Sequence, residues 1–304
     1  MAFPSIAQVG AFFAVYTHGS TVRAARTLGK SQSQISANIA RLEDEMGTVL
    51  FVRANGRLHP TERADELAEL ARELLDAYQR FTAQGSDFGT DRQFTIGAPR
   101  SLSMTLLPKV SKALRTDLPG LKIKLRFRSY QEIVTEVAEG DLDIGITKLP
   151  VLDKRVLVQP MCDAPSVVLM PKDHPLVGKD HIQPSDIGNQ PMIRLGTGLD
   201  YWEKIELAFR DQKLTANFAF EVGGVGPACR MVAEGLGLSI VNQLMAEDYL
   251  DLLGLAARRF KPEIMHRFVC VSSPFSEKAI LLKKFNDTVA THVTQRRQTN
   301  DAAE

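Results

Sequence analysis

Apolar residues recur at helical spacing near the start of the chain. Positions three or four residues apart would share one face of a helix: Ile6, Val9, Phe13 and Tyr16. Ser5 is a residue type that caps helix starts, and Gly19 is suited to a helix end. The pattern therefore predicts a first helix between these two residues. A second, very short helix is expected between Ser20 and Gly29, with three residues facing inward: Val22, Ala25 and Leu28.

A third helix and a β-hairpin are expected next. Ser31 is a candidate N-cap, and the apolar residues after it recur at i, i+4, i+7 and i+11: Ile35, Ile39, Leu42 and Met46. The opposite side of this helix is polar and carries one charge, Arg41. Residues 49–53 and 57–59 then flank Asn55-Gly56, a strong hairpin signal because both residues tolerate positive φ.

A longer helical pattern runs from Thr61 to about Phe81 without Gly or Pro. Its apolar residues recur at steps of three and four: Ala64, Leu67, Leu70, Ala71, Leu74, Tyr78 and Phe81. An isolated helix of about 20 residues cannot bury such a stripe by itself. The helix must therefore pack on its own domain or pair with a second copy of the chain, and the strong acidity of its other face favours pairing.

Beyond residue 90, β-like runs alternate with helical patterns. The expected order is strand 94–98, helix 105–116, strand 121–127, helix 131–139 and strand 142–147. Later strands are expected at 167–170, 191–195, 218–222, 238–241 and 268–271, with a final helix near 277–293. This pattern predicts two α/β subdomains with a cleft between them. Subdomain I comprises about 90–161 and 267–304, and subdomain II about 162–266.

Composition and charge refine this division. A chain of 304 residues favours two domains, and 44% hydrophobic residues suffice for packed cores. The 37 Lys and Arg nearly balance the 36 Asp and Glu, but residues 1–60 carry a net charge of +3 and residues 61–88 carry −4. A Gly, Ser and Asp cluster at 85–91 marks a boundary. We therefore expect a first domain at 1–60, a linker helix and hinge at 61–89, and a large domain at 90–304.

The third helix and the hairpin have the chemistry of a DNA-reading element. A Gln side chain can pair with adenine in the major groove, and Ser can contact a base edge or a phosphate. The positive end of the helix dipole lies at Ser31 and Gln32, where it favours a nearby phosphate. Arginines on the hairpin can neutralise further phosphates.

The same segments resemble a known family. The runs 20–28 and 31–36, together with Ile39, Leu42-Glu43, Gly47, Leu50-Phe51, Arg53 and Thr61, are similar to the winged helix-turn-helix of LysR-type transcriptional regulators. The runs 140–146, 169–176 and 232–241 resemble the effector-binding domain of that family, which itself resembles periplasmic solute-binding proteins. The resemblance covers nearly the whole chain, although Ala37 stands where the family often has a basic residue.

The resemblance implies an α/β fold class in three parts: an N-terminal winged helix-turn-helix, a long linker helix and a C-terminal effector domain of two subdomains. It also implies a homodimer, or a tetramer built as a dimer of dimers, bound to double-stranded DNA. Our candidate DNA-binding residues are Thr21, Ser31, Gln32, Ser33, Ser36, Ala37, Arg41, Arg53, Asn55 and Arg57.

Polar residues follow the expected strands of the large domain. Ligands of open α/β sheets bind beyond the carboxyl ends of the strands. Hydroxyl and backbone N–H groups there, with a nearby Arg or Lys, could hold a carboxylate or a similar anion, although each Ser or Thr could equally cap its own helix. The candidate effector-binding residues are Arg100, Ser101, Ser103, Ser129, Tyr130, Thr147, Lys148, Thr197 and Gly224.

Other function classes find little support in the sequence. The six histidines show no metal-ligand spacing and no common catalytic motif occurs, so we expect no enzyme, metal or cofactor. Residues 223–226 are rich in glycine but do not form the dinucleotide-binding fingerprint. The chain has no apolar run of about 18 residues and no export-signal pattern. Its three scattered cysteines suit a reducing compartment, so we expect a cytoplasmic protein without a membrane partner.

The sequence thus predicts a transcription factor that senses a small polar organic molecule, anionic or amino-acid-like, in the cleft of its large domain. RNA polymerase is a candidate partner. The alternative is a cytoplasmic small-molecule-binding protein or an enzyme with an accessory helical domain, but this alternative does not explain the pattern of residues 1–60.

Overall fold

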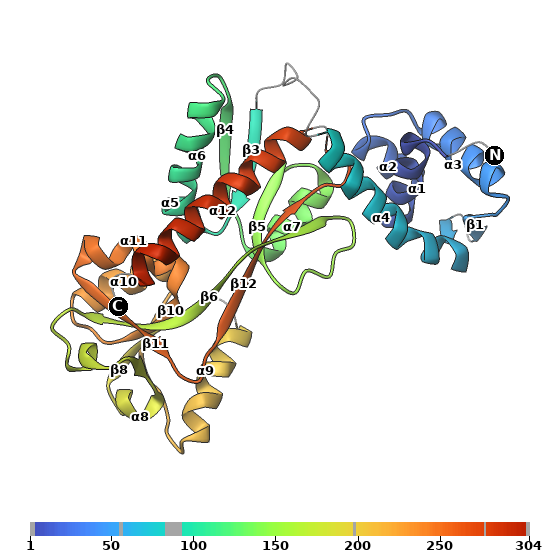
Figure 1. Ribbon diagram of the computed structural model, residues 1–304. Helices are drawn as coiled ribbons and strands as arrows, with labels where there is room; N and C mark the ends of the chain where they lie inside the picture. Colours follow the sequence, from blue (N-terminus) through green and yellow to red (C-terminus); the bar gives the residue numbers. More distant parts are fainter. Residues whose placement is uncertain (1–3, 55–56, 83–92, 197–198, 277, 302–304) are drawn as a thin grey trace. The chain divides into compact units, whose positions relative to one another are not determined.

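The computed structural model describes residues 4–54, 57–82, 93–196, 199–276 and 278–301 (Figure 1). Its contacts divide the chain into two compact units. Unit 1 comprises residues 1–98, 110–159 and 269–304, and unit 2 comprises residues 99–109 and 160–268.

Unit 1 begins with three helices whose ends are set by local sequence. They are α1 (Ile6–His18), α2 (Thr21–Thr27) and α3 (Gln32–Met46). The hydroxyls of Ser5, Ser20 and Ser31 accept hydrogen bonds from backbone N–H groups in the first turns, as expected of N-caps. Gly19 ends α1 with a φ of 62°, a left-handed conformation that glycine adopts without strain. The prediction of three short helices is confirmed.

Helix α1 packs into two adjoining clusters of buried side chains. One cluster joins α1 to α2 and α3: Ala11, Ala14, Val15, Ala24, Ala25, Ile35 and Ile39. The other joins α1 to α3 and to the long helix that follows: Phe12, Phe13, Leu42, Leu50, Ala64, Ala71 and Leu75. The prediction that Val22 faces inward is wrong, because this side chain is 60% exposed. The buried positions of α2 are taken by the small residues Ala24 and Ala25, which allow the helices to approach closely.

An antiparallel hairpin, which we call the wing, follows α3. It consists of β1 (Phe51–Ala54) and β2 (Arg57–Pro60), with Ala54 opposite Arg57. The expected turn residues Asn55 and Gly56 lie outside the described residues. Glu43 of α3 fixes the wing, since its Oε1 accepts hydrogen bonds from the N–H groups of Leu50 at 2.7 Å and Phe51 at 3.2 Å.

The long helix α4 (Glu62–Thr82) divides its apolar residues between two surroundings. Ala64, Ala71 and Leu75 are buried in the second cluster, and the hydroxyl of Tyr16 in α1 donates to Asp65 at 2.8 Å. Other members of the stripe are 44–77% exposed: Leu70, Leu74, Tyr78 and Phe81. One side of α4 therefore packs on its own domain, while a second side remains apolar and open.

The rest of unit 1 is a parallel sheet flanked by helices (Figure 1). Its elements are β3 (Gln93–Ala98), most of α6 (Leu106–Asp117), β4 (Lys122–Phe127), α7 (Tyr130–Glu139), β5 (Ile144–Lys148) and α12 (Ala279–Asp301). Strand β3 pairs in parallel with β4 on one side and with β5 on the other, which confirms the predicted βαβαβ order. Gly145 allows α7 to lie close to β5, because a Cβ at this position would be 2.2 Å from Cγ2 of Ile133.

Unit 2 holds the second α/β part. Its helices are α5 (Arg100–Met104), the 3-10 turn Pro175–Gly178, α8 (Pro184–Ile187), α9 (Leu199–Asp211), α10 (Val225–Ala233) and α11 (Gln243–Leu253). Its strands are β7 (His181–Ile182), β8 (Pro191–Leu195), β9 (Asn217–Val222), β10 (Ser239–Asn242), β11 (Leu255–Phe260) and parts of β6 (Leu157–Pro171) and β12 (Met265–Ser272). The chain passes between the units within β6 and again within β12.

The strands expected in the second half of the chain are observed, together with two that were not predicted, β7 and β11. Each predicted run falls in β6, β8, β9 or β12, or overlaps β10. Strand β11 was not predicted, because its central residues Ala257, Arg258 and Arg259 lack an alternation of apolar and polar side chains. It forms through antiparallel pairing with β6, a tertiary contact that a local pattern does not encode.

Candidate nucleic-acid interface and sensor site

The first turns of α3 present hydrogen-bonding side chains to solvent. The residues that the helical pattern placed on the outer side are all exposed: Gln32, Ser33, Ser36, Ala37 and Arg41. The helix start is closed by a reciprocal cap in which Ser31 Oγ accepts from the N–H of Gln34 at 3.3 Å and Gln34 Oε1 accepts from the N–H of Ser31 at 2.9 Å. The role of Gln34 was not predicted, although the spacing Ser-x-x-Gln is typical of such a capping box.

A neighbouring helix positions Gln32. Its Nε2 donates a hydrogen bond to Oγ1 of Thr21, the first residue of α2, at 3.1 Å. Thr21 is only 9% exposed, so it has little surface of its own with which to contact a partner. The two helices of the helix-turn-helix are thus joined by a polar contact at the point where α3 begins.

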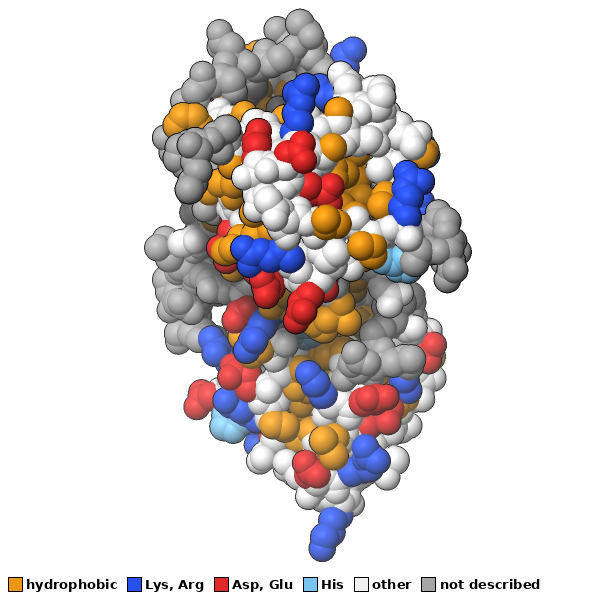
Figure 2. Space-filling model, turned by 90° about the vertical axis from the view of Figure 1, so that its right-hand side faces the viewer, with side chains coloured by type: hydrophobic (Ala, Val, Ile, Leu, Met, Phe, Trp, Pro, Cys, Tyr) orange, Lys and Arg blue, Asp and Glu red, His pale blue; other side chains and the backbone are white. Residues whose placement is uncertain are grey.

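Arginines occur on α3 and on the wing that follows it. Arg41 on α3 and Arg53 on β1 are exposed. Arg57 begins β2, but its side chain and the whole of Asn55 lie outside what the structure describes. On the face drawn in Figure 2, Lys and Arg side chains are interspersed with acidic and apolar ones.

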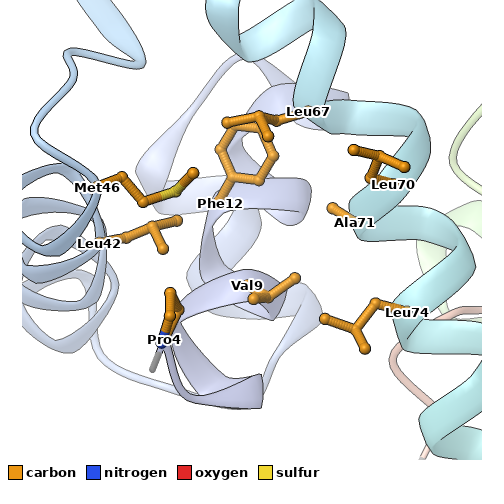
Figure 3. A pocket seen from close by; sticks show the side chains of 9 residues that line it. All are labelled: Pro4, Val9, Phe12, Leu42, Met46, Leu67, Leu70, Ala71 and Leu74. Carbon is orange, nitrogen blue, oxygen red and sulfur yellow. The ribbon is translucent and has the colours of Figure 1, made fainter. Parts of the chain in front are cut away.

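An apolar groove of about 310 Å³ lies between α1, α3 and α4 (Figure 3). Its lining is entirely apolar: Pro4, Val9, Phe12, Leu42, Met46, Leu67, Leu70, Ala71 and Leu74. Leu70 and Leu74 are 60% and 50% exposed. An open apolar surface of this kind is typical of a site that binds another protein segment.

Three candidate sensor residues of unit 1 lie together. The hydroxyl of Thr147 donates to the backbone oxygen of Tyr130 at 3.2 Å, and the Lys148 ammonium lies 5.0 Å from the centre of the Tyr130 ring. Burial lowers the pKa of Lys148 to about 8 and raises the pKa of Tyr130. Ser129 adjoins them, but its hydroxyl accepts from the N–H of Glu132 at 3.3 Å and so caps α7.

The other candidate sensor residues belong to unit 2 or its neighbouring loops. Arg100, Ser101 and Ser103 form most of the short helix α5, where Ser103 is buried. Gly224 precedes α10. Thr197 lies outside the described residues. Among the described candidates, the contacts bring together Tyr130, Thr147 and Lys148 of unit 1.

Two family models match this arrangement. The model of bacterial regulatory helix-turn-helix proteins of the lysR family matches residues 6–65, and the model of the LysR substrate binding domain matches residues 89–293. The chain belongs to the LysR family of bacterial transcriptional regulators.

Curated relatives of this LysR-type regulator extend over most of its length. The transcriptional activator protein LysR of Escherichia coli K12 is 27% identical over 262 residues, which cover 86% of this chain and 84% of the relative. The HTH-type transcriptional regulator cbl of the same organism is 30% identical and covers 72% of this chain and 71% of the relative.

Solved structures share the fold of this regulator. HinK, a LysR family transcriptional regulator from Pseudomonas aeruginosa, superposes with a TM-score of 0.56 at 22% identity, over 94% of this chain and 98% of HinK. The oxidized form of OxyR from Corynebacterium glutamicum also gives 0.56, at 19% identity, over 99% of this chain and 95% of OxyR. The predicted fold, an N-terminal helix-turn-helix with a C-terminal α/β effector domain, is confirmed.

The described residues of this LysR-type regulator were also searched for membrane-spanning helices and metal sites. None of the helices in the described ranges is long and apolar enough to cross a membrane. Within the same ranges, no group of three or more His, Cys, Asp or Glu side chains is arranged to hold a metal ion.

The hydrogen bond between Thr21 and Gln32 yields a testable expectation. Thr21→Val removes the acceptor, so the Gln32 amide loses its fixed orientation and specific DNA binding weakens by about 0.5–1.5 kcal/mol. Thr21→Ser keeps the hydroxyl and should bind as the unmodified protein does. Titrations of an operator duplex and of a scrambled duplex measure both effects. An equal loss on the two duplexes would contradict a role in positioning Gln32.

Proposed function

We propose that this LysR-type regulator reads a DNA duplex with the start of α3 and grips its backbone with arginines on α3 and the wing. The observation that carries the proposal is the outer face of α3, where Gln32, Ser33 and Ser36 are exposed beside Arg41. Uncharged hydrogen-bonding groups at a helix start are the chemistry that distinguishes base pairs in the major groove.

The candidate residues divide into two roles. We assign base contacts to Gln32, Ser33, Ser36 and Ala37, and phosphate contacts to Ser31, Arg41, Arg53, Asn55 and Arg57. Thr21 is assigned a supporting role, because its hydroxyl holds Gln32. Base contacts carry sequence information, whereas phosphate contacts carry affinity and salt dependence.

Arg53 tests the phosphate role. The full chain should bind a duplex from upstream of its own gene, and Arg53→Ala should lower the slope of log affinity against log salt by roughly one unit, because one fewer counterion is released. Affinity is measured by fluorescence anisotropy over a series of salt concentrations. Arg115→Ala, which removes an exposed arginine on α6, is the matched control and should leave the slope unchanged.

Gln32→Ala supplies the contrast in the same assay. It should cost about 1–3 kcal/mol on the specific duplex and almost nothing on a scrambled one. A protein that binds neither duplex even at low salt would refute the proposed function, whereas an unchanged slope for Arg53→Ala would remove only Arg53 from the interface.

We propose further that α4 pairs with α4 of a second copy to form a homodimer, which could assemble into a tetramer. The apolar groove between α1, α3 and α4 is lined by Leu70 and Leu74 of α4 (Figure 3), and both side chains are at least half exposed. Exposed residues of the same stripe, Tyr78 and Phe81, extend this surface toward the end of the helix. A twofold dimer would present two copies of α3 to two DNA half-sites.

Leu74 tests the dimer. Leu74→Asp places a charge in the exposed stripe that the dimer would bury and removes roughly 1.5–3 kcal/mol of apolar burial for each copy, so the dimer should dissociate. Sedimentation velocity at several protein concentrations measures the change. Leu252→Asp is the matched control, since Leu252 is 70% exposed on α11 and lies outside the groove. A fully dimeric Leu74→Asp protein would exclude α4 pairing.

For the sensor we propose a small polar effector that is anionic or amino-acid-like. The support is chemical: Lys148 supplies a half-buried cation, and Thr147 and Tyr130 supply polar and aromatic surface beside it. Arg100, Ser101, Ser103, Ser129, Thr197 and Gly224 complete the proposed set, by their sequence positions after the strands. The effector would favour one arrangement of the sensor and so change the affinity for DNA, with reciprocal coupling of about 1–3 kcal/mol.

Lys148 tests this sensor assignment. In a thermal-shift screen of the full chain against small carboxylic acids, amino acids and aromatic acids, a ligand that binds the folded protein raises the melting temperature by mass action. Lys148→Met should abolish that rise, whereas Lys112→Met on the exposed side of α6 should retain it. A full rise in Lys148→Met would place the effector elsewhere.

The remaining assignments follow from this function. We propose domain limits of 1–60, 61–89 and 90–304, with the sensor divided into subdomain I (about 90–161 and 267–304) and subdomain II (about 162–266). A regulator of this kind acts beside the chromosome in the cytoplasm, meets RNA polymerase there, and needs neither catalytic activity nor a cofactor.

A further inference from the structure

A phenylalanine from the sensor part of the chain packs against the helix-turn-helix. Phe275 follows β12 and precedes α12, more than 190 residues after the wing. It is nevertheless packed against both buried clusters around α1, together with residues of the wing such as Phe51. The centres of the Phe275 and Phe13 rings are 6.0 Å apart, at an interplanar angle of 49°. Ring pairs at this separation add to the stabilisation that apolar burial provides.

The segment that carries Phe275 is braced against the sensor sheet. The N–H of Phe275 donates to Ser273 Oγ at 3.2 Å, which shapes the turn. Three residues later, the Lys278 ammonium donates to the backbone oxygen of Gln93 at 2.7 Å and lies 3.0 Å from a carboxylate oxygen of Asp143. These partners border β3 and β5, so one end of the segment is fixed to the sheet while the phenylalanine ring reaches α1.

A second part of the sensor lies near the C-terminal end of α1. Asp153 and Arg155, which follow β5, form an ion pair of 2.5 Å. Both act electrostatically on His18, the last residue of α1, and His18 in turn hydrogen-bonds Thr27 of α2 at 3.1 Å. The pKa of His18 is lowered mainly by burial and further by Arg155 and Arg23. Helix α12 also packs alongside α4. The approach of the sensor to the helix-turn-helix thus involves several segments of unit 1.

We infer that Phe275 is an aromatic anchor that holds the helix-turn-helix to the first sensor subdomain of the same chain and thereby stabilises α1. The inference rests on the proposed function for its consequence: a change in the sensor would reach α3 through α1, in addition to any route through α4. The contact itself does not require an effector or DNA. It connects a segment that precedes residue 83 with one that follows residue 92.

Hydrogen exchange of the full chain tests the anchor without DNA or effector. In Phe275→Ala, peptides from α1 and α2 should exchange about tenfold faster, the factor produced by a loss of roughly 1.4 kcal/mol of local stability. Peptides from β3, β4 and β5 should keep their protection. Phe275→Leu retains most of the apolar volume and should restore much of the protection in α1.

Phe127→Ala is the matched control. Phe127 ends β4 in the same unit, is 49% exposed and is absent from both clusters around α1, so its removal should leave exchange in α1 and α2 unchanged. Unchanged exchange of α1 in Phe275→Ala would overturn the inference. Equal acceleration across β3, β4 and β5 would also overturn it, because Phe275 would then stabilise the sensor alone. The operator duplex is also titrated with Phe275→Ala. If this variant still binds the duplex, either exchange result overturns only the inference about Phe275 and leaves the proposed function standing.

Discussion

Burial of α1 is the constraint on which the N-terminal part of the regulator, from α1 to α4, depends. Phe12 and Phe13 are adjacent in sequence and point into a core that α3, α4 and the wing complete. Ala11, Ala14 and Val15 meet α2 and α3 on the other side. Because α1 is enclosed by these elements, the orientation of α3 relative to α4 follows from the packing of one helix. The exposed polar start of α3 and the exposed apolar side of α4 are two results of the same burial.

Much of this architecture could be predicted from local sequence. Helix starts at Ser5, Ser20 and Ser31 and the end at Gly19 follow from backbone hydrogen bonding and from the freedom of glycine, which act within a few residues. The βαβαβ order follows from apolar runs in the same way. Long-range packing decided the remainder. Val22 is exposed because smaller neighbours fill the interface, and β11 exists because β6 offers it a partner.

The candidate sites show the same division. The outward face of α3 could be predicted because helical periodicity alone separates Gln32 and Ser36 from Ile35 and Ile39. The hydrogen bond between Gln32 and Thr21 depends on the angle between two helices, and the contact of Phe275 with α1 joins segments distant in sequence. In the sensor, strand ends brought Tyr130, Thr147 and Lys148 together as the parallel sheet requires. Ser129 belongs to a helix cap, which position after a strand does not distinguish from a ligand contact.

The reversal of charge between the first domain and α4 has an electrostatic consequence for the encounter with a polyanion. Residues 1–60 carry +3, and the acidic residues of α4 follow immediately. The 21 residues of α4 span about 31 Å, several times the screening distance of roughly 8 Å at physiological ionic strength. A duplex close to the protein is therefore attracted by residues 1–60 and repelled along α4. Such a gradient orients the collision before any short-range contact forms, and it disfavours encounters in which the helix lies flat along the phosphates.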